Sequence, residues 1–216
     1  MDKSQIQTLL SIHEWESFEA KRAQASPGKL IETVCAMINT RGGLLVVGLD
    51  DEKNTKGDSR LLGISEGLDN ISEFKKLLKS EFEPPLHQLV SVQEIEITNN
   101  KKLKDELFLV WIEKSQDVHS LKNGDTFIRT GSHNTKIGSQ EITRLKYEKG
   151  SIKSETEVTI IDSLDQLDID LINKYKKDNK SSNEDTWQFL KDSGLALELN
   201  NKHLLTKGGA LIFAKN

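Results

Sequence analysis

The chain of 216 residues lacks several features that define common classes of protein. Cys35 is its single cysteine, which excludes an intramolecular disulfide and a zinc site built from cysteines. The five histidines never fall at the spacing of a metal-binding motif. No G-x-x-x-x-G-K-[ST] segment occurs, so we expect no ATP site in this chain.

Long apolar runs are also missing. No stretch approaches the roughly 20 apolar residues that a membrane-spanning helix needs. The first ten residues, MDKSQIQTLL, lack the basic region and apolar run of a secretory signal. We therefore expect a cytoplasmic protein with no membrane partner.

The sequence has no excess of positive charge. Its net charge is −4, and residues 1–150 carry 21 basic against 23 acidic residues, while residues 151–216 carry 9 against 11. Proteins that coat nucleic acid in bulk are strongly basic. Any nucleic-acid site must therefore be a local patch on an acidic protein.

Residues 1–150 alternate between helical and extended patterns. Ser26 followed by Pro27 is typical of a helix start, and apolar residues continue at helical spacing up to the glycines at 42–43. The apolar run at 44–49 predicts a buried strand, a helix is expected near 71–80, and another strand at 107–112. Asn123-Gly124 predicts a hairpin joining 120–121 to 126–128. These elements predict an α+β fold, a mixed β-sheet with flanking helices.

Residues 151–216 differ in composition. A polar stretch at 151–158 reads as a linker, and two helices are expected within 163–192. A hairpin around Asn200-Asn201 follows, so we predict a small, mostly helical, winged-helix-like unit. Because the sequence stops just after an apolar stretch, GGALIF, we expect this unit to begin a truncated C-terminal region.

Three segments together resemble a known family. They are residues 14–21 (EWESFEAK), residues 34–51 (VCAMINTRGGLLVVGLDD) and residues 127–134 (FIRTGSHN). They are similar to the E-x-E-x-x-E-F-K, A-N-T-x-G-G and R-x-G-S-x-N motifs of the AlbA-like Schlafen domain, although Ala20 replaces an aromatic residue. The resemblance covers about residues 8–149. Residues 205–213 resemble the element that follows in long bacterial members, which are transcriptional regulators with a further C-terminal domain.

Acidic residues cluster in the first two of these segments. Carboxylates from neighbouring strands can hold Mg²⁺ or Mn²⁺, although a glutamate-rich opening is more often a solvated helix end. In Schlafen ribonucleases two glutamates five positions apart and a later aspartate form the metal site, with a lysine beside them. The resemblance places the metal ligands at Glu14, Glu19 and Asp50, or Asp51 in its place, and the lysine at Lys21.

A second group of residues is suited to phosphate binding. Gly42 and Gly43 offer backbone N–H groups beside Arg41, and Lys21 and Arg129 are further candidates. The alternative for the glycines is a tight turn from helix to strand, and for Arg129 an ion pair with the acidic cluster. Trp15 can stack on a base, but core packing is its commoner fate.

Three functions are consistent with these patterns. The first is a nucleic-acid-binding domain, for DNA or RNA, of a transcriptional regulator. The second is an endoribonuclease that depends on Mg²⁺ or Mn²⁺ and uses Glu14, Glu19, Lys21 and Asp50. The third is a dimerisation or protein-interaction scaffold. Since the mammalian ribonucleases use a duplicated arrangement, a homodimer is the expected way for one such domain to supply it.

Overall fold

The computed structural model describes residues 3–215, and the chain divides into two compact units, residues 1–151 and 152–216. Each unit has its own buried hydrophobic clusters, two in the first unit and one in the second. The first unit contains the sheet and the second contains helices and one small hairpin.

A four-stranded mixed sheet forms the centre of the first unit. Its strands, in spatial order, are β1 (Phe18–Lys21), β2 (Gly43–Val47), β5 (Lys104–Ile112) and β4 (Val90–Thr98). β1 runs parallel to β2, and the other neighbours are antiparallel. The predicted α+β class with a mixed sheet and flanking helices is therefore confirmed.

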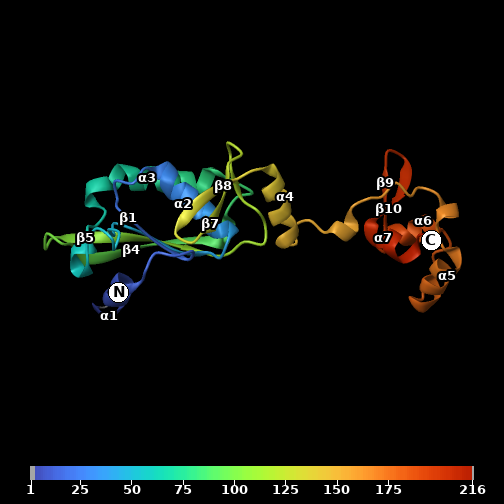
Figure 1. The fold of residues 1–216 in the computed structure, drawn as a ribbon, viewed down its shortest axis with the longest axis horizontal. Coiled ribbons are helices and arrows are strands. Elements are labelled where there is room, and N and C mark those ends of the chain that lie inside the picture. Colours follow the sequence, from blue (N-terminus) through green and yellow to red (C-terminus); the bar gives the residue numbers. More distant parts are fainter. Residues whose placement is uncertain (1–2, 216) are drawn as a thin grey trace. The chain divides into compact units, whose positions relative to one another are not determined.

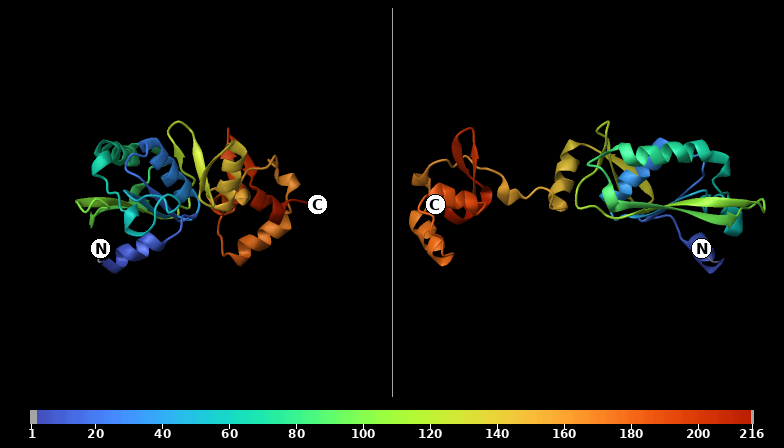
Figure 2. Two further views of the ribbon diagram at one scale, coloured as in Figure 1. Left: turned by 60° about the vertical axis from the view of Figure 1, so that its left-hand side comes forward. Right: turned by 180° about the vertical axis from the view of Figure 1, so that it is seen from behind.

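Helices cover both faces of this sheet, as the views in Figure 1 and Figure 2 show. They are α1 (Lys3–Ser11), α2 (Pro27–Asn39) and α3 (Leu68–Ser80). α2 and α3 pack on the face that presents Leu45, Val47 and Phe108, while α1 packs on the face that presents Leu44 and Val46. Period-two alternation along the strands produces these two separate cores.

The hairpins beside the sheet correct one prediction. Short strands are β3 (Phe82–Glu83), β6 (Ser120–Leu121), β7 (Thr126–Thr130) and β8 (His133–Ile137). β6 pairs with β3, and β7 pairs with β8 around Gly131, so the segments on either side of Asn123-Gly124 do not form the predicted ladder with each other. A turn does form there, with the Gly124 N–H donating to the Leu121 carbonyl, but a two-residue β6 leaves β7 free to form a longer ladder with β8.

Helix α4 (Ser139–Glu148) ends the first unit. The remaining helical segments of the described residues are single 3₁₀ turns at Gly57–Arg60, Ser65–Gly67, His87–Leu89, Ser154–Thr156 and Leu164–Gln166. Among the described residues, no helix is long and apolar enough to cross a bilayer.

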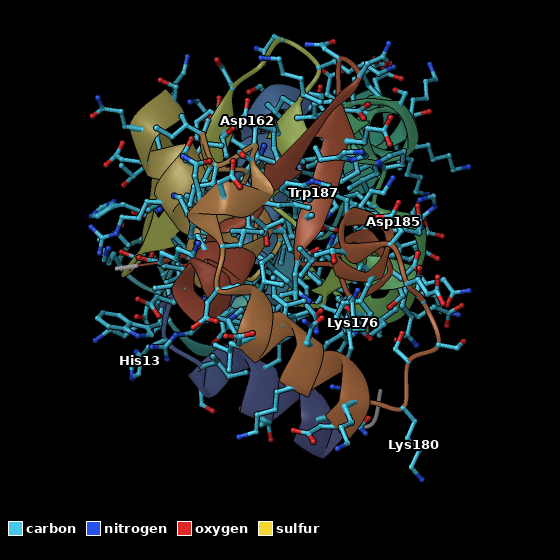
Figure 3. All side chains as sticks on the ribbon, turned by 90° about the vertical axis from the view of Figure 1, so that its right-hand side faces the viewer. His13, Asp162, Lys176, Lys180, Asp185 and Trp187 are labelled. Atoms are coloured by element: carbon cyan, nitrogen blue, oxygen red, sulfur yellow. The ribbon has the colours of Figure 1, made fainter. Side chains whose placement is uncertain are left out.

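The second unit has a helix–helix–hairpin–helix order. Its elements are α5 (Ile169–Asp178), α6 (Thr186–Asp192), β9 (Ala196–Leu199), β10 (Lys202–Leu205) and α7 (Lys207–Phe213). Asp185, labelled with Trp187 in Figure 3, caps α6 by accepting the Gln188 N–H. Trp187 stacks on His203 with ring centres 5.4 Å apart. The two helices and the hairpin predicted from the sequence are present, with left-handed backbone at Asn200 and Asn201 in the turn.

Candidate nucleic-acid interface

The alternation of β1 determines where its charged side chains lie. Glu19 and Lys21 pair with Leu45 and Val47, whose side chains belong to the core under α2 and α3. In neighbouring parallel strands, paired residues point to the same face. Glu19 is therefore directed inward and is almost completely buried, whereas the longer side chain of Lys21 reaches the surface.

Arg129 on β7 is the principal partner of Glu19. Its guanidinium is fully buried and bonds to the Glu19 carboxylate through Nη2, which also donates to the Trp15 carbonyl at 3.1 Å. Nη1 donates to Asn134 Oδ1 at 2.7 Å. Of the two roles predicted for Arg129, the structure therefore supports the ion pair and not the contact with phosphate, because the guanidinium has no solvent-exposed surface.

Glu14 lies on the open edge of β1. Its Oε1 accepts the Ala20 N–H at 3.1 Å, which satisfies a backbone donor that none of the described strands pairs with. Burial raises the pKa of the Glu14 carboxyl, and the negative charge of nearby Glu19 raises it further. Glu14 and Glu19 are thus neighbours, as their positions on the same segment predict.

Asp50 has different surroundings. Arg22 donates to both of its carboxylate oxygens, from Nε at 2.7 Å and from Nη2 at 2.8 Å. Asn54 and Thr55 add side-chain hydrogen bonds at 3.2 and 3.1 Å. The bonds from Arg22 are the main cause that lowers the pKa of Asp50 to about 2.

The three predicted metal ligands do not form a metal site. Glu19 is bonded to Arg129 and Lys21, and Asp50 is enclosed by Arg22 and its polar neighbours. Among the described residues, no group of three or more His, Cys, Asp or Glu side chains could hold a metal ion. The arrangement therefore does not fit the Mg²⁺ or Mn²⁺ that the resemblance implies, because Glu19 and Asp50 are already bonded to cationic side chains and Glu14 accepts the Ala20 N–H.

The glycines at 42–43 are required by close packing. A Cβ on Gly42 would lie 2.4 Å from the Ile112 carbonyl oxygen, and one on Gly43 would lie 2.2 Å from the Ser17 carbonyl oxygen. The Gly42 N–H donates to the Met37 carbonyl at 2.8 Å, so this donor is not open to a phosphate. The structure favours the tight-turn interpretation for both glycines.

Arg41, in the same turn, is available. Its side chain is 70% exposed and its Nε donates to Glu16 at 2.8 Å. Arg22, at the far end of β1, is 52% exposed despite its bonds to Asp50. Arg41 is a candidate predicted from the sequence, whereas Arg22 is not, although Arg22 directly follows the strand that carries Lys21.

Trp15 is on the surface, which corrects the expectation that it packs in the core. It is 62% exposed and its ring lies beside Gly131 in the β7–β8 turn, where a Cβ would be 3.7 Å from Trp15 Cζ3. Trp15 and Phe18 form an isolated bridge, which holds this segment against the start of β1. The rim of β1 thus presents an indole and three basic side chains: Trp15, Lys21, Arg22 and Arg41.

The fold and this rim define a mixed α+β domain with basic and aromatic groups along one sheet edge. A comparison with protein families matches residues 14–138 to the family described as "Schlafen, AlbA_2". The match covers more than half of the chain, so the chain belongs to this family. Membership supports a nucleic-acid-related role for the first unit.

No curated protein sequence matches the chain. Among solved structures, the chain is similar to the DIP2311 protein from Corynebacterium diphtheriae, at 15% identity and a TM-score of 0.46. That match covers 98% of this chain and 44% of the DIP2311 chain.

Proposed function

We propose that the first unit binds nucleic acid along the rim of β1, as part of a transcriptional regulator. The observation that carries this proposal is a set of exposed groups along β1, with Trp15 and Arg41 near its start and Lys21 and Arg22 at its end, in a domain of a nucleic-acid-related family. Exposed aromatic rings that interrupt a basic groove are the usual means of binding unstacked bases and backbone together.

The spacing of the cations suits a nucleic-acid backbone. Arg41 is beside the start of β1, since the Leu44 N–H donates to the Ser17 carbonyl, and Lys21 and Arg22 are at the end of β1. Four residues of strand span roughly 13 Å, a length that corresponds to about four base-pair steps along the axis of a duplex. Contacts of this kind bind the backbone and carry no base specificity.

The acidic residues of the rim limit the strength of binding. Glu16 faces Arg41 and Asp50 faces Arg22, so each cation is partly neutralised before a phosphate arrives. Phosphate must compete with these carboxylates, and added salt screens the remaining attraction. We therefore expect binding that is detectable at low salt and falls steeply as salt is added.

The test is fluorescence anisotropy of the full chain with a labelled RNA hairpin, single-stranded DNA and duplex DNA, in Mn²⁺, Mg²⁺ or EDTA. Binding that is unaffected by EDTA and weakened by Trp15→Ala by about 1–3 kcal/mol supports the proposal. Lys76→Ala, on an exposed face of α3, is the control that leaves binding unchanged. Cleavage of RNA that requires metal and is lost in Glu19→Ala contradicts a purely binding role. Absence of binding at low salt contradicts the proposal and favours the alternative of a dimerisation or protein-interaction scaffold.

A further inference from the structure

The strand at the opposite end of the sheet from β1 has an open edge. β4 is the last strand in the order, and it pairs only with β5 among the described strands. At its two ends, the Asn99 N–H donates to the Leu103 carbonyl and the Glu113 N–H donates to the Leu89 carbonyl. Because donors alternate along an antiparallel pair, the N–H and C=O groups of Val90, Val92 and Glu94 point away from β5.

A groove of about 660 Å³ lies between this edge and α3. Val90, Val92, Leu78 and Phe108 line it with apolar surface, and Val92 is 51% exposed. Lys75 bonds to Glu94 and lies over the Phe108 ring, 5.0 Å from its centre.

Lys79 lines the same groove but has no acidic partner among the described residues. An occupant of the groove should therefore be extended, apolar where it meets Val92, and negatively charged where it meets Lys79. Such an occupant satisfies the open backbone donors, the apolar surface and the unpaired cation together.

β4 also lacks the usual protection of an edge strand. Its nine residues, VSVQEIEIT, contain no proline and no lysine, which are common blocks against strand addition. Glu94 and Glu96 are its only charged residues. A long edge of this kind pairs readily with another strand.

We propose that β4 pairs with β4 of a second copy of this chain, antiparallel and centred on Val92. In this register Val92 lies opposite the partner's Val92, and Val90 lies opposite the partner's Glu94. The partner's Glu94 then enters the groove that holds Lys79. A register centred on Glu94 is disfavoured, because it places two carboxylates opposite each other.

The pairing leaves the rim of β1 free. β1 and β4 are the two ends of the sheet order, so the joined sheet of the dimer carries one rim at each end. The inference therefore does not rest on the proposed nucleic-acid binding, and either can fail alone.

The first test is a cross-link at the symmetry axis. Val92→Cys should form a covalent dimer under mild oxidation, since each cysteine meets its own copy. Native Cys35 is buried, and burial raises the pKa of its thiol to about 11, so it does not compete. Thr98→Cys, exposed on the same strand but without a partner in this register, should yield less than about one tenth as much dimer in the same time.

The second test reverses charges. In sedimentation equilibrium, Lys79→Glu should raise the dimer dissociation constant by about tenfold, because the pair occurs twice by symmetry. Glu94→Lys should do the same, and the double variant Lys79→Glu with Glu94→Lys should restore the dimer. Lys76→Glu, on the same helix, should have no effect.

Two results overturn the proposal. One is a chain that stays monomeric at every concentration with no Val92→Cys cross-link, which would point instead to an extended acidic peptide from another protein. The other is a dimer that none of these variants alters, which would place the interface elsewhere. Circular dichroism of each variant separates either result from a loss of folding.

Discussion

Two carboxylate–guanidinium pairs in the first unit differ in the burial of the cation. Arg129 is fully buried against Glu19, whereas Arg22 is half-exposed against Asp50. The difference arises from their positions: Arg129 is on a strand that packs over α2, and Arg22 directly follows β1 at the surface. Burial, and not the presence of a carboxylate partner, therefore separates a cation that holds the fold from one that can meet a ligand.

The buried pair links the β7–β8 hairpin to residues of β1 and α2 that lie more than 100 positions earlier in the sequence. Arg129 bonds Glu19 of β1 and Asn134 of β8, and Asn134 in turn donates to Thr33 of α2 at 2.9 Å. The backbone N–H of Arg129 also donates to the Thr40 hydroxyl at 2.8 Å. This network fixes the β7–β8 hairpin beside Trp15 and so positions the surface that we assign to nucleic acid.

The largest effect should come from Arg129→Ala. The substitution leaves the Glu19 carboxylate buried with Lys21 alone, and removing one partner of a buried pair costs about 3–5 kcal/mol. Urea unfolding of both proteins measures the loss in the free energy of unfolding. A loss below about 1 kcal/mol would show that the buried pair does not hold the hairpin.

The second-largest loss in the free energy of unfolding should come from Gly43→Ala. Its Cβ would meet the Ser17 carbonyl oxygen in a backbone conformation with φ +145°, so the turn that carries Arg41 must shift. We expect a loss of about 2–3 kcal/mol in the free energy of unfolding. Gly28→Ala is the matched control, because its Cβ would meet no atom of the described residues within 4 Å outside the neighbouring helix backbone, and α2 should gain up to about 1 kcal/mol. Equal effects of the two substitutions would contradict this reading of the turn.

The third-largest effect should be the loss of the pair between Asp50 and Arg22 in acid. The pKa of Asp50 is lowered from 3.8 to about 2, so the folded state binds its proton less readily than the unfolded chain. The stabilisation is present above pH 4 and disappears as the pH falls towards 2, and it amounts to about 2 kcal/mol. Asp50→Asn should reduce the change in the free energy of unfolding between pH 4 and pH 2, as measured by unfolding experiments at each pH. An unchanged profile would exclude Asp50 as its source.

Arg41→Ala should have the smallest effect on stability. Its pair with Glu16 is exposed, and such pairs contribute less than about 1 kcal/mol. Thermal unfolding should therefore be nearly unchanged, within about 0.5 kcal/mol. A larger loss would make Arg41 a structural residue like Arg129 and remove the contrast between the two.

Local patterns predicted the elements well. Ser26-Pro27 begins α2, the run before Asp50 forms β2, and Asn200-Asn201 turns between β9 and β10. Each depends on residues close in the sequence, where capping, periodicity and turn preferences act directly. The family resemblance over residues 127–134 also identified Arg129 as a candidate residue. Of the two roles predicted for Arg129, the ion pair with the acidic cluster is the one observed.

What the sequence did not predict depends on contacts between distant residues. Asp50 was grouped with Glu19, but the side chain of Arg22, 28 positions away, encloses it. Trp15 was expected in the core, yet its bridge to Phe18 leaves the indole outside. The ladder predicted across Asn123-Gly124 does not form, because β6 pairs with β3, almost 40 residues earlier, and β7 pairs with β8. Packing between distant segments determines these contacts, and local sequence patterns do not predict them.

The salt dependence of binding tests the central claim most directly. For a labelled RNA hairpin or DNA between about 50 and 200 mM salt, the slope of log Kobs against log [salt] counts the phosphates that the protein neutralises. Arg41→Ala should lower the magnitude of this slope by about 1 while the free energy of unfolding stays the same. Lys76→Ala should alter neither. A slope that Arg41→Ala leaves unchanged would show that the rim of β1 does not bind the nucleic-acid backbone.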